Sequence, residues 1–284
     1  QLFIGNRVFT AQKVKAIVNE VFFIIIGVTG YIFIMAQGNL DFSIGSLMGL
    51  CCAAAATGAN IHPILAIPVA IAVGATGGLL SGFVHAKLKL GSLVGTMATQ
   101  YVIGGILLLW LDGGTKMAPL GMLQWNTMTL KVIVILVVVM AGLYVYNYTS
   151  YGKYSRAIGS CQEAAKQTGV NVPRIKIMSF VIMGCLAGLL GFFSLIRTGT
   201  ATVTTGSDLF MNVLCAALLG GIPLSGGYGA KFSSVIIGSL TMAFLSNGMV
   251  LLGVGTYDKQ LIKGIVFLIT IAISFDRKNL VTIK

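Results

Sequence analysis

The sequence has few charged residues. They make up 9% of its 284 residues, with 7 acidic against 19 basic side chains, whereas a soluble domain carries about 25%. So few charges cannot cover a soluble surface, which excludes a soluble enzyme, a secreted disulfide scaffold and a disordered chain. Apolar residues reach 56%, the mean hydropathy is +0.94, and several apolar runs approach the ~20 residues of a membrane-spanning helix. The composition predicts an all-α polytopic membrane protein with a single transmembrane domain over residues 1–284.

The sequence also lacks the patterns of common catalytic and metal sites. Residues 226–231 approach a phosphate-binding loop but have no glycine beside the lysine and no following Ser or Thr. His62 and His85 are isolated, and no pair of carboxylates lies close in sequence for acid–base work. We therefore expect no enzyme activity, no metal and no cofactor in this chain. Energy for any transport must then come from an ion gradient or from a partner.

The formal net charge of +12 is best explained by the membrane. The basic residues flank apolar runs, and the cytoplasmic loops of membrane proteins carry such an excess of Lys and Arg. Nucleic acid is therefore not an expected partner. The five cysteines form no C-x-x-C pair and are expected to be small apolar residues. The sequence begins at Gln1 rather than Met, and we expect a further N-terminal piece.

Basic residues also predict the orientation of the chain. The segment before the first apolar run carries three, the turn at 87–89 two, the loop 147–176 five and the C-terminal tail three. Both termini and the loop 147–176 are therefore expected in the cytoplasm. If the run 16–37 crosses outward and 63–85 returns, the stretch 38–61 cannot cross fully. We expect it to be re-entrant, with about eight crossings elsewhere.

Two glycine-rich breaks interrupt the apolar runs at comparable places in the two halves, at 38–46 and 220–229. Non-helical backbone at membrane depth must be buried in protein or line a cavity. The paired breaks favour two structurally related halves with a pathway between them, although ordinary loops are the alternative. Gly74, Gly78 and Gly82 form one small-residue face and Gly184 with Gly188 another, which permits close helix packing within the chain or across a dimer.

Polar residues near these breaks are the candidates for a pathway. Asp41, Ser43 and Ser46 precede a helix, so Asp41 either caps that helix or lines the pathway. Arg197 and the polar run 198–208 are expected outside the membrane. Hydroxyls in this run either contact a binding protein or an incoming solute, or belong to a plain solvated loop.

The loop 147–176 is predicted to contain a short helix. Residues 162–167 are good helix formers, and Gly169 is a natural stop. Such a helix is too short to be stable alone, so either this chain or a docked cytoplasmic partner must hold it.

Three segments resemble the permeases of ribose-type ABC importers. Residues 156–172, with Ala-Ile-Gly, Ala-Ala and Gly-Val-Asn-Val, look like the A-I-G-x-N-x-x-A-A-x-x-x-G-I-x-V segment of that family. Residues 38–46 are similar to its G-G-I-D-L-S-V-G-S signature, and 219–229 to its G-G-x-S-L-x-G-G-x-G. Order and spacing match across nearly the whole chain. Cys161 and Pro223 depart from the pattern, which leaves the substrate open.

The resemblance implies the transmembrane permease subunit of an ATP-binding cassette importer in the bacterial inner membrane. Its solute would be a monosaccharide, either ribose-like or similar to autoinducer-2. Implied partners are a second permease copy, identical or paralogous, an extracytoplasmic binding protein, and a cytoplasmic ATPase that binds ATP and Mg²⁺. Alternatives are a branched-chain amino acid or nucleoside permease of the same kind, and an ion-coupled secondary transporter or channel.

The candidate residues form two groups. Those expected along the pathway are Asn39, Asp41, Ser43, Ser46, Phe210 and Asn212. Those expected to couple the chain to the ATPase, by resemblance, are Arg156, Gly159, Glu163, Ala164, Ala165 and Gly169.

Overall fold

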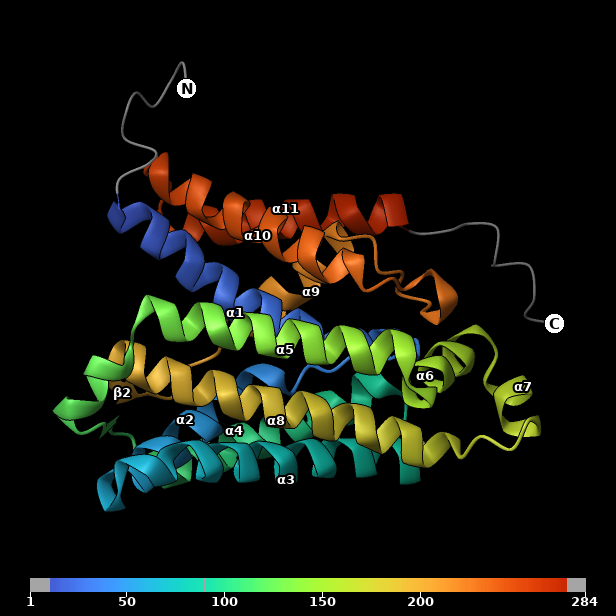
Figure 1. Cartoon of the computed structure of the whole chain (residues 1–284), viewed down its shortest axis with the longest axis horizontal. Helices are drawn as coiled ribbons and strands as arrows, with labels where there is room; N and C mark the ends of the chain where they lie inside the picture. The colour runs from blue at the N-terminus through green and yellow to red at the C-terminus, as the bar shows by residue number, and fades with distance from the viewer. Residues whose placement is uncertain (1–10, 89, 275–284) are drawn as a thin grey trace.

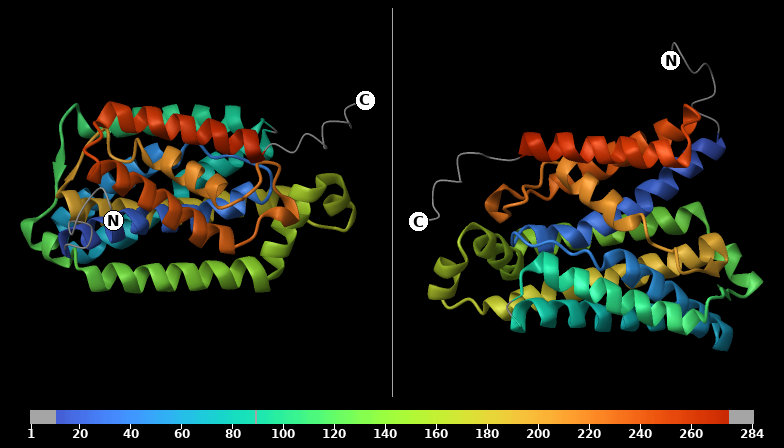
Figure 2. Two further views of the ribbon diagram at one scale, coloured as in Figure 1. Left: turned by 90° about the horizontal axis from the view of Figure 1, so that it is seen from above. Right: turned by 180° about the vertical axis from the view of Figure 1, so that it is seen from behind.

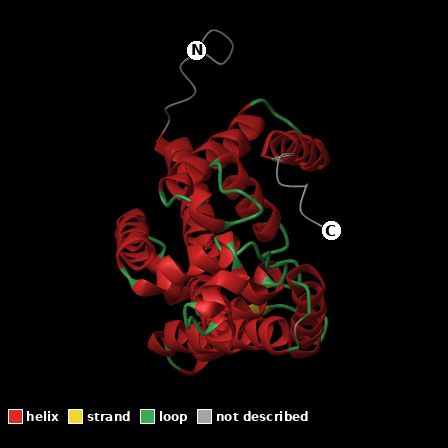
Figure 3. Cartoon of the chain, turned by 90° about the vertical axis from the view of Figure 1, so that its right-hand side faces the viewer, coloured by secondary structure: helices red, strands yellow, loops and turns green. Residues whose placement is uncertain are grey.

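The computed structural model describes residues 11–88 and 90–274, and nearly all of this part of the chain is helical (Figures 1 and 3). The α-helices are α1 (Ala11–Met35), α2 (Ile44–Ile61), α3 (Ala66–Lys87), α4 (Ser92–Leu111), α5 (Met128–Tyr148), α6 (Ser150–Ser160), α7 (Gln162–Gln167), α8 (Val172–Thr198), α9 (Leu209–Leu219), α10 (Ser233–Leu251) and α11 (Thr256–Ser274). Short 3₁₀ turns are η2 (Pro63–Leu65), η3 (Leu120–Trp125) and η4 (Gly227–Gly229), and the strands are β1 (Lys116–Met117) and β2 (Thr200–Ala201).

Within the described residues, seven helices are long and apolar enough to cross a membrane: α1, α2, α3 with η2, α4, α5, α8 and α10. Each has at least 18 residues, which reaches the ~17–25 residues that a bilayer-spanning helix needs. The all-α polytopic architecture is therefore confirmed. The helix α9 is shorter, with 11 residues.

The bundle has two ends that carry different structures. At one end β1 and β2 pair antiparallel, with Lys116 opposite Ala201, and we name this the β end. At the opposite end lie α6 and α7, and we name this the α7 end (Figure 1). Asn19, early in α1, accepts a hydrogen bond from Lys131 at the start of α5, and Gln37, just after α1, donates to Ser155 of α6. The helix α1 thus runs from the β end to the α7 end.

The structure corrects two expectations about topology. The stretch 38–61 is not re-entrant, because α2 is a span that ends at the β end, where Asn60 donates to the carbonyl of Met117. Since α2 crosses, α1 must start on the side opposite to α6 and α7. Lys15, near the start of α1, therefore lies at the β end, opposite to the loop 147–176. We expected the basic residues before the first apolar run to lie on the same side as that loop, and this is wrong for Lys15. The termini themselves, 1–10 and 275–284, lie outside the described residues, while α11 ends at the α7 end (Figures 1 and 2).

The two glycine faces pack against each other inside this chain. A Cβ built on Gly74 would overlap the carbonyl oxygen of Gly184, and one on Gly78 would overlap that of Phe180. The backbones of α3 and α8 therefore lie in direct contact, as small residues allow in membranes. This contact and the burial of α1 and α2 form a rigid core around which the pathway elements are arranged.

Candidate functional site

The segment that leads into α9 descends into the bundle without forming a helix. Thr200 lies beside Cys52, whose Sγ is 4.0 Å from its carbonyl oxygen, and Gly206 lies against the backbone of Gly45. The distance from Cys52 to Gly45 along the axis of α2 is about 10 Å. The half-crossing expected at 38–61 is therefore formed by residues 202–208 with the short helix α9. The expectation that the whole run 198–208 stays outside the membrane is wrong for its second half.

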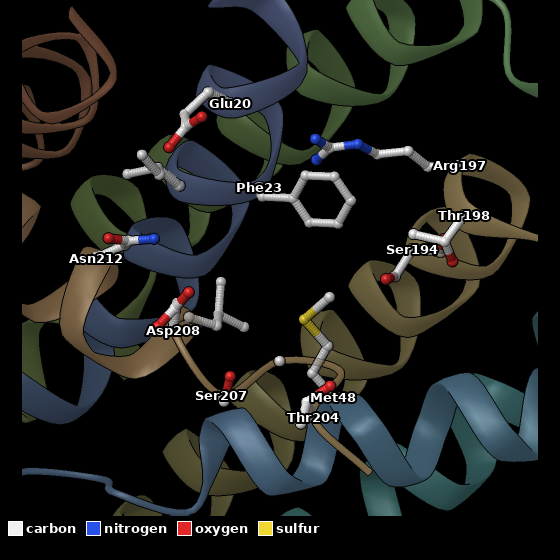
Figure 4. A pocket seen from close by; sticks show the side chains of 13 residues that line it. Glu20, Phe23, Met48, Ser194, Arg197, Thr198, Thr204, Ser207, Asp208 and Asn212 are labelled. Atoms are coloured by element: carbon white, nitrogen blue, oxygen red, sulfur yellow. The ribbon is translucent and has the colours of Figure 1, made fainter. Parts of the chain in front are cut away.

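This segment lines a polar pocket of about 290 Å³ between α1, α8 and α9 (Figure 4). Thr204, Ser207 and Asp208 are exposed although they lie at the depth of the α2 span. Polar groups at that depth need a water-filled cavity or protein partners. The lining residues are Glu20, Phe23, Ile24, Met48, Ser194, Arg197, Thr198, Thr204, Gly206, Ser207, Asp208, Leu209 and Asn212.

Charged groups of both signs face this pocket around an aromatic ring. The guanidinium of Arg197 lies 5.4 Å from the ring centroid of Phe23, within the range of a cation–π contact. Glu20 and Asp208 contribute carboxylates from α1 and from the residue before α9 (Figure 4). Glu20 was not among the sequence candidates, because its position near the start of an apolar run is also typical of a residue at the membrane boundary. Such a pocket offers both donors and acceptors to a polar solute.

Asp41 lies in the turn between α1 and α2 and is 2% exposed. Its Oδ1 accepts hydrogen bonds from the backbone N–H of Ser43 at 2.9 Å and from the Ser43 hydroxyl at 2.6 Å. The backbone N–H of Asp41 donates to the hydroxyl of Tyr31. The carboxylate thus holds the turn before α2. It does not cap the helix, because Ser43 is the N-cap residue and no side chain caps α2. Asp41 is also not among the residues that line the polar pocket.

The other pathway candidates fall into two places. Phe210 stacks on Phe42, with ring centroids 4.3 Å apart, so the start of α9 packs on the turn that contains Asn39 and Asp41. Asn39 is buried, and Ser46 is half-buried on α2. Asn212 instead faces the polar pocket and accepts a hydrogen bond from Lys263 of α11 at 2.8 Å.

The predicted short helix is present as α7, with the expected bounds. The chain itself holds it, because Ala165 is 5% exposed and packs with Ile158 of α6 and Val172 of α8. Glu163 and Ala164 are exposed on its other side. Of the three small or acidic residues expected to form one surface, Ala165 is therefore not available to a partner.

Gly169 ends this unit in the left-handed conformation, with φ of 84°. The backbone N–H of Gly169 donates to the carbonyl of Lys166, and Asn171 then caps α8 by accepting from the N–H of Arg174. The predicted stop at Gly169 is confirmed, and it turns the chain back toward the membrane.

The helix α6, which the sequence did not distinguish, connects α7 to the end of α1, just before the break 38–46, and to the break 220–229. Gly159 lies against the carbonyl of Ala36 and the backbone nitrogen of Gly227, and a Cβ at this position would overlap the Ala36 oxygen. The N–H of Gly227 donates to that same oxygen at 2.8 Å. Arg156 extends this contact, since its guanidinium lies 5.7 Å from the ring centroid of Tyr228.

A polar cluster beside this junction joins three helices. Gln37 donates to the hydroxyls of Ser155 and Ser179, at 3.3 and 2.5 Å, and Tyr151 lies within hydrogen-bond distance of Ser179. Burial raises the pKa of the Tyr151 phenol. Sequence reasoning missed this cluster. The only signal was a few isolated polar residues in otherwise apolar runs, and such residues are common in membrane helices.

Within the described residues, no group of three or more His, Cys, Asp or Glu side chains is placed to hold a metal ion. The fold and the pocket define a multi-pass helical membrane protein in which polar, non-helical backbone lies at membrane depth, as it does in transport proteins.

The family is shown by a match of residues 14–271 to the model described as branched-chain amino acid transport system / permease component. The chain belongs to this family of permease components.

Named relatives are similar over most of their length. The chain is 28% identical to the ribose import permease protein RbsC of Escherichia coli (strain K12) over 93% of this chain and 86% of that protein. It is 31% identical to the L-arabinose transport system permease protein AraH of the same strain, over 87% and 77%. It is 30% identical to the autoinducer 2 import system permease protein LsrC of Shigella flexneri, over 94% and 80%. No solved structure is significantly similar. The resemblance of the three sequence segments to sugar importer permeases is thereby confirmed.

Proposed function

We propose that this chain is the transmembrane subunit of an ABC importer that moves a monosaccharide into the bacterial cytoplasm. The observation that carries the proposal is the polar pocket beside the non-helical residues 202–208, at the depth of a membrane span. The names of the relatives, which concern ribose, arabinose and autoinducer 2, support a small polyhydroxy solute. Carboxylates, an amide and an aromatic ring in one pocket are groups that such a solute can use.

In this proposal the α7 end faces the cytoplasm of a cell whose inner membrane holds the protein. The loop 147–176 carries five basic residues, which favours the cytoplasmic side. The β end then faces outward and receives solute from a binding protein. The chain itself performs no chemistry and holds no cofactor. A partner ATPase binds ATP and Mg²⁺, and a second permease copy completes the pore.

The ATPase docks on the exposed side of α7, where Glu163 and Ala164 lie. Because α7 packs on α6, a movement of the docked ATPase shifts both helices together. Gly159 and Arg156 pass this movement to Ala36 and to the break 220–229. Ala36 is joined through the next few residues to Asp41 and the start of α2. The breaks at the α7 end thus respond to the nucleotide cycle.

Asp41 acts in this scheme by shaping the turn from which the pathway opens. Its carboxylate fixes Ser43 at the start of α2, and Phe42 in the same turn stacks on Phe210. A change in the turn therefore alters the start of α9 and, two residues beyond Phe210, Asn212 in the polar pocket.

The test is uptake into proteoliposomes that contain this permease, its cognate ATPase and its binding protein. We expect ATP-dependent accumulation of a labelled pentose or a related monosaccharide, and none of labelled leucine. Accumulation of leucine instead would favour the amino acid permease that the family description names. Accumulation driven by an ion gradient without ATP would overturn the ABC importer proposal.

A further inference from the structure

A groove lies on the outside of the bundle between the α7 ends of α3 and α8. Its volume is about 600 Å³, and it is lined by Leu79, Lys87, Asn171, Pro173, Arg174, Ile177, Met178 and Val181. It is separate from the polar pocket at the other end. Nothing in the proposed transport cycle uses it.

The groove has a charged mouth and an apolar floor. Lys87 is the last residue of α3, and Arg174 lies in the first turn of α8, so both cations sit where these spans leave the membrane. Both side chains are exposed, and no acidic residue lines the groove. The Nζ of Lys87 lies 6.0 Å from the ring centroid of Phe83. The mouth therefore presents two cations to an anionic group.

The floor follows one face of α8. Arg174, Ile177, Met178 and Val181 are spaced at i, i+3, i+4 and i+7, and from Arg174 to Val181 the face runs about 10 Å into the span. Leu79 closes the groove from α3 and is 54% exposed, as is Met178 at 53%. An apolar furrow that begins at two cations matches one ligand class, a lipid with an anionic head group and an acyl chain.

We propose that this groove binds an anionic phospholipid, with the phosphate between Lys87 and Arg174 and an acyl chain along Ile177, Met178 and Val181. Basic pockets between membrane helices at the cytoplasmic side are typical sites for such head groups. The head group would bridge the end of α3 and the start of α8, the helix that follows α7. This site rests on α3 and α8 spanning the membrane and on the proposed cytoplasmic placement of the α7 end, and it does not depend on the transported solute.

The experiment is native mass spectrometry of the purified chain with added dioleoylphosphatidylglycerol or dioleoylphosphatidylcholine. We expect one tightly retained phosphatidylglycerol per chain, in preference to phosphatidylcholine. The double variant Lys87→Gln/Arg174→Gln should lose this preference, with about a fivefold weaker retention for each cation removed. Met178→Trp, which fills the furrow without changing charge, should also weaken retention.

The matched control is Lys153→Gln/Lys231→Gln, which removes two exposed cations from the same end of the molecule but outside the groove. Its lipid retention should equal that of the unaltered chain. Equal retention of phosphatidylglycerol by both double variants would overturn the proposal. The proposal would also be overturned if a second copy of this chain occupied the groove. In that case Met178→Trp would reduce the dimer peak and leave the number of bound lipids unchanged.

Discussion

Gly159 of α6 lies directly against the carbonyl oxygen of Ala36, at the end of the central helix α1. The same oxygen accepts a hydrogen bond from the backbone of Gly227. One small residue on the segment beside the proposed ATPase site thus contacts Ala36, two residues before the break 38–46, and Gly227 within the break 220–229. Segments far apart in the sequence meet at a single point, which gives a short physical route from α7 to the turn at Asp41.

This contact leaves no space for a methyl group at residue 159. We expect Gly159→Ala to cost about 1–3 kcal/mol of stability through overpacking and to reduce uptake strongly. Gly105→Ala is the control, because a Cβ there meets nothing within 4 Å and alanine favours the helix α4. Melting temperature in detergent and uptake in proteoliposomes measure both effects. Unchanged uptake by Gly159→Ala would show that movement does not pass through this contact.

Asp41→Asn separates the geometry of the turn from its charge. Asparagine keeps an Oδ1 that can accept the two hydrogen bonds from Ser43, so insertion and assembly should be preserved. The charge that favours the N-terminus of α2 is lost, and we expect uptake to fall. Uptake assays beside a measurement of assembled complex test this. Transport at the unaltered level would mean that Asp41 only holds the turn before α2.

Gly169 should tolerate few replacements. Its φ of 84° costs a β-branched residue at least about 1–2 kcal/mol, whereas asparagine adopts this region more readily. Space is not the cause, since a Cβ at Gly169 meets nothing within 4 Å. We expect Gly169→Val to impair ATPase docking and Gly169→Asn to retain most of it. Equal docking by the two variants would rule out backbone conformation as the reason.

The orientation of the bundle can be read from two cysteines. Val203 is 40% exposed in the segment after β2, and the native Cys161 is exposed between α6 and α7. In intact spheroplasts, a membrane-impermeant maleimide should label Val203→Cys and leave Cys161 unlabelled until the membrane is permeabilised. The reverse pattern would invert the proposed orientation.

Local signals in the sequence were sufficient for much of the fold. Apolar runs located most of the spans, and the helix formers at 162–167 with Gly169 located α7. The glycine faces indicated close helix packing, which the structure shows to lie between α3 and α8. Each of these features depends on residues close in sequence or on a repeated spacing. They were therefore visible without any tertiary contact.

Topology and the pocket depended on contacts between distant segments. The count of basic residues placed Lys15 on the same side of the membrane as the loop 147–176. With α1 starting on that side, the stretch 38–61 could not cross the membrane, and α2 was wrongly assigned as re-entrant. Residues 202–208 look like a polar outer loop until their packing along Gly45 and Gly49 is known. Glu20 likewise becomes a pocket residue through its position opposite Asp208, which no local pattern encodes (Figure 4).

The central claim is that a separate ATPase drives this chain by docking on the exposed side of α7. The direct measurement is the ratio of ATPase to permease after affinity purification of the permease, for Ala164→Trp and for Val203→Trp. Both positions are exposed, but they lie toward opposite ends of the bundle. We expect Ala164→Trp to lose the ATPase and Val203→Trp to retain it at the unaltered ratio. Full retention by Ala164→Trp, with normal solute-stimulated hydrolysis, would show that the ATPase does not dock on α7.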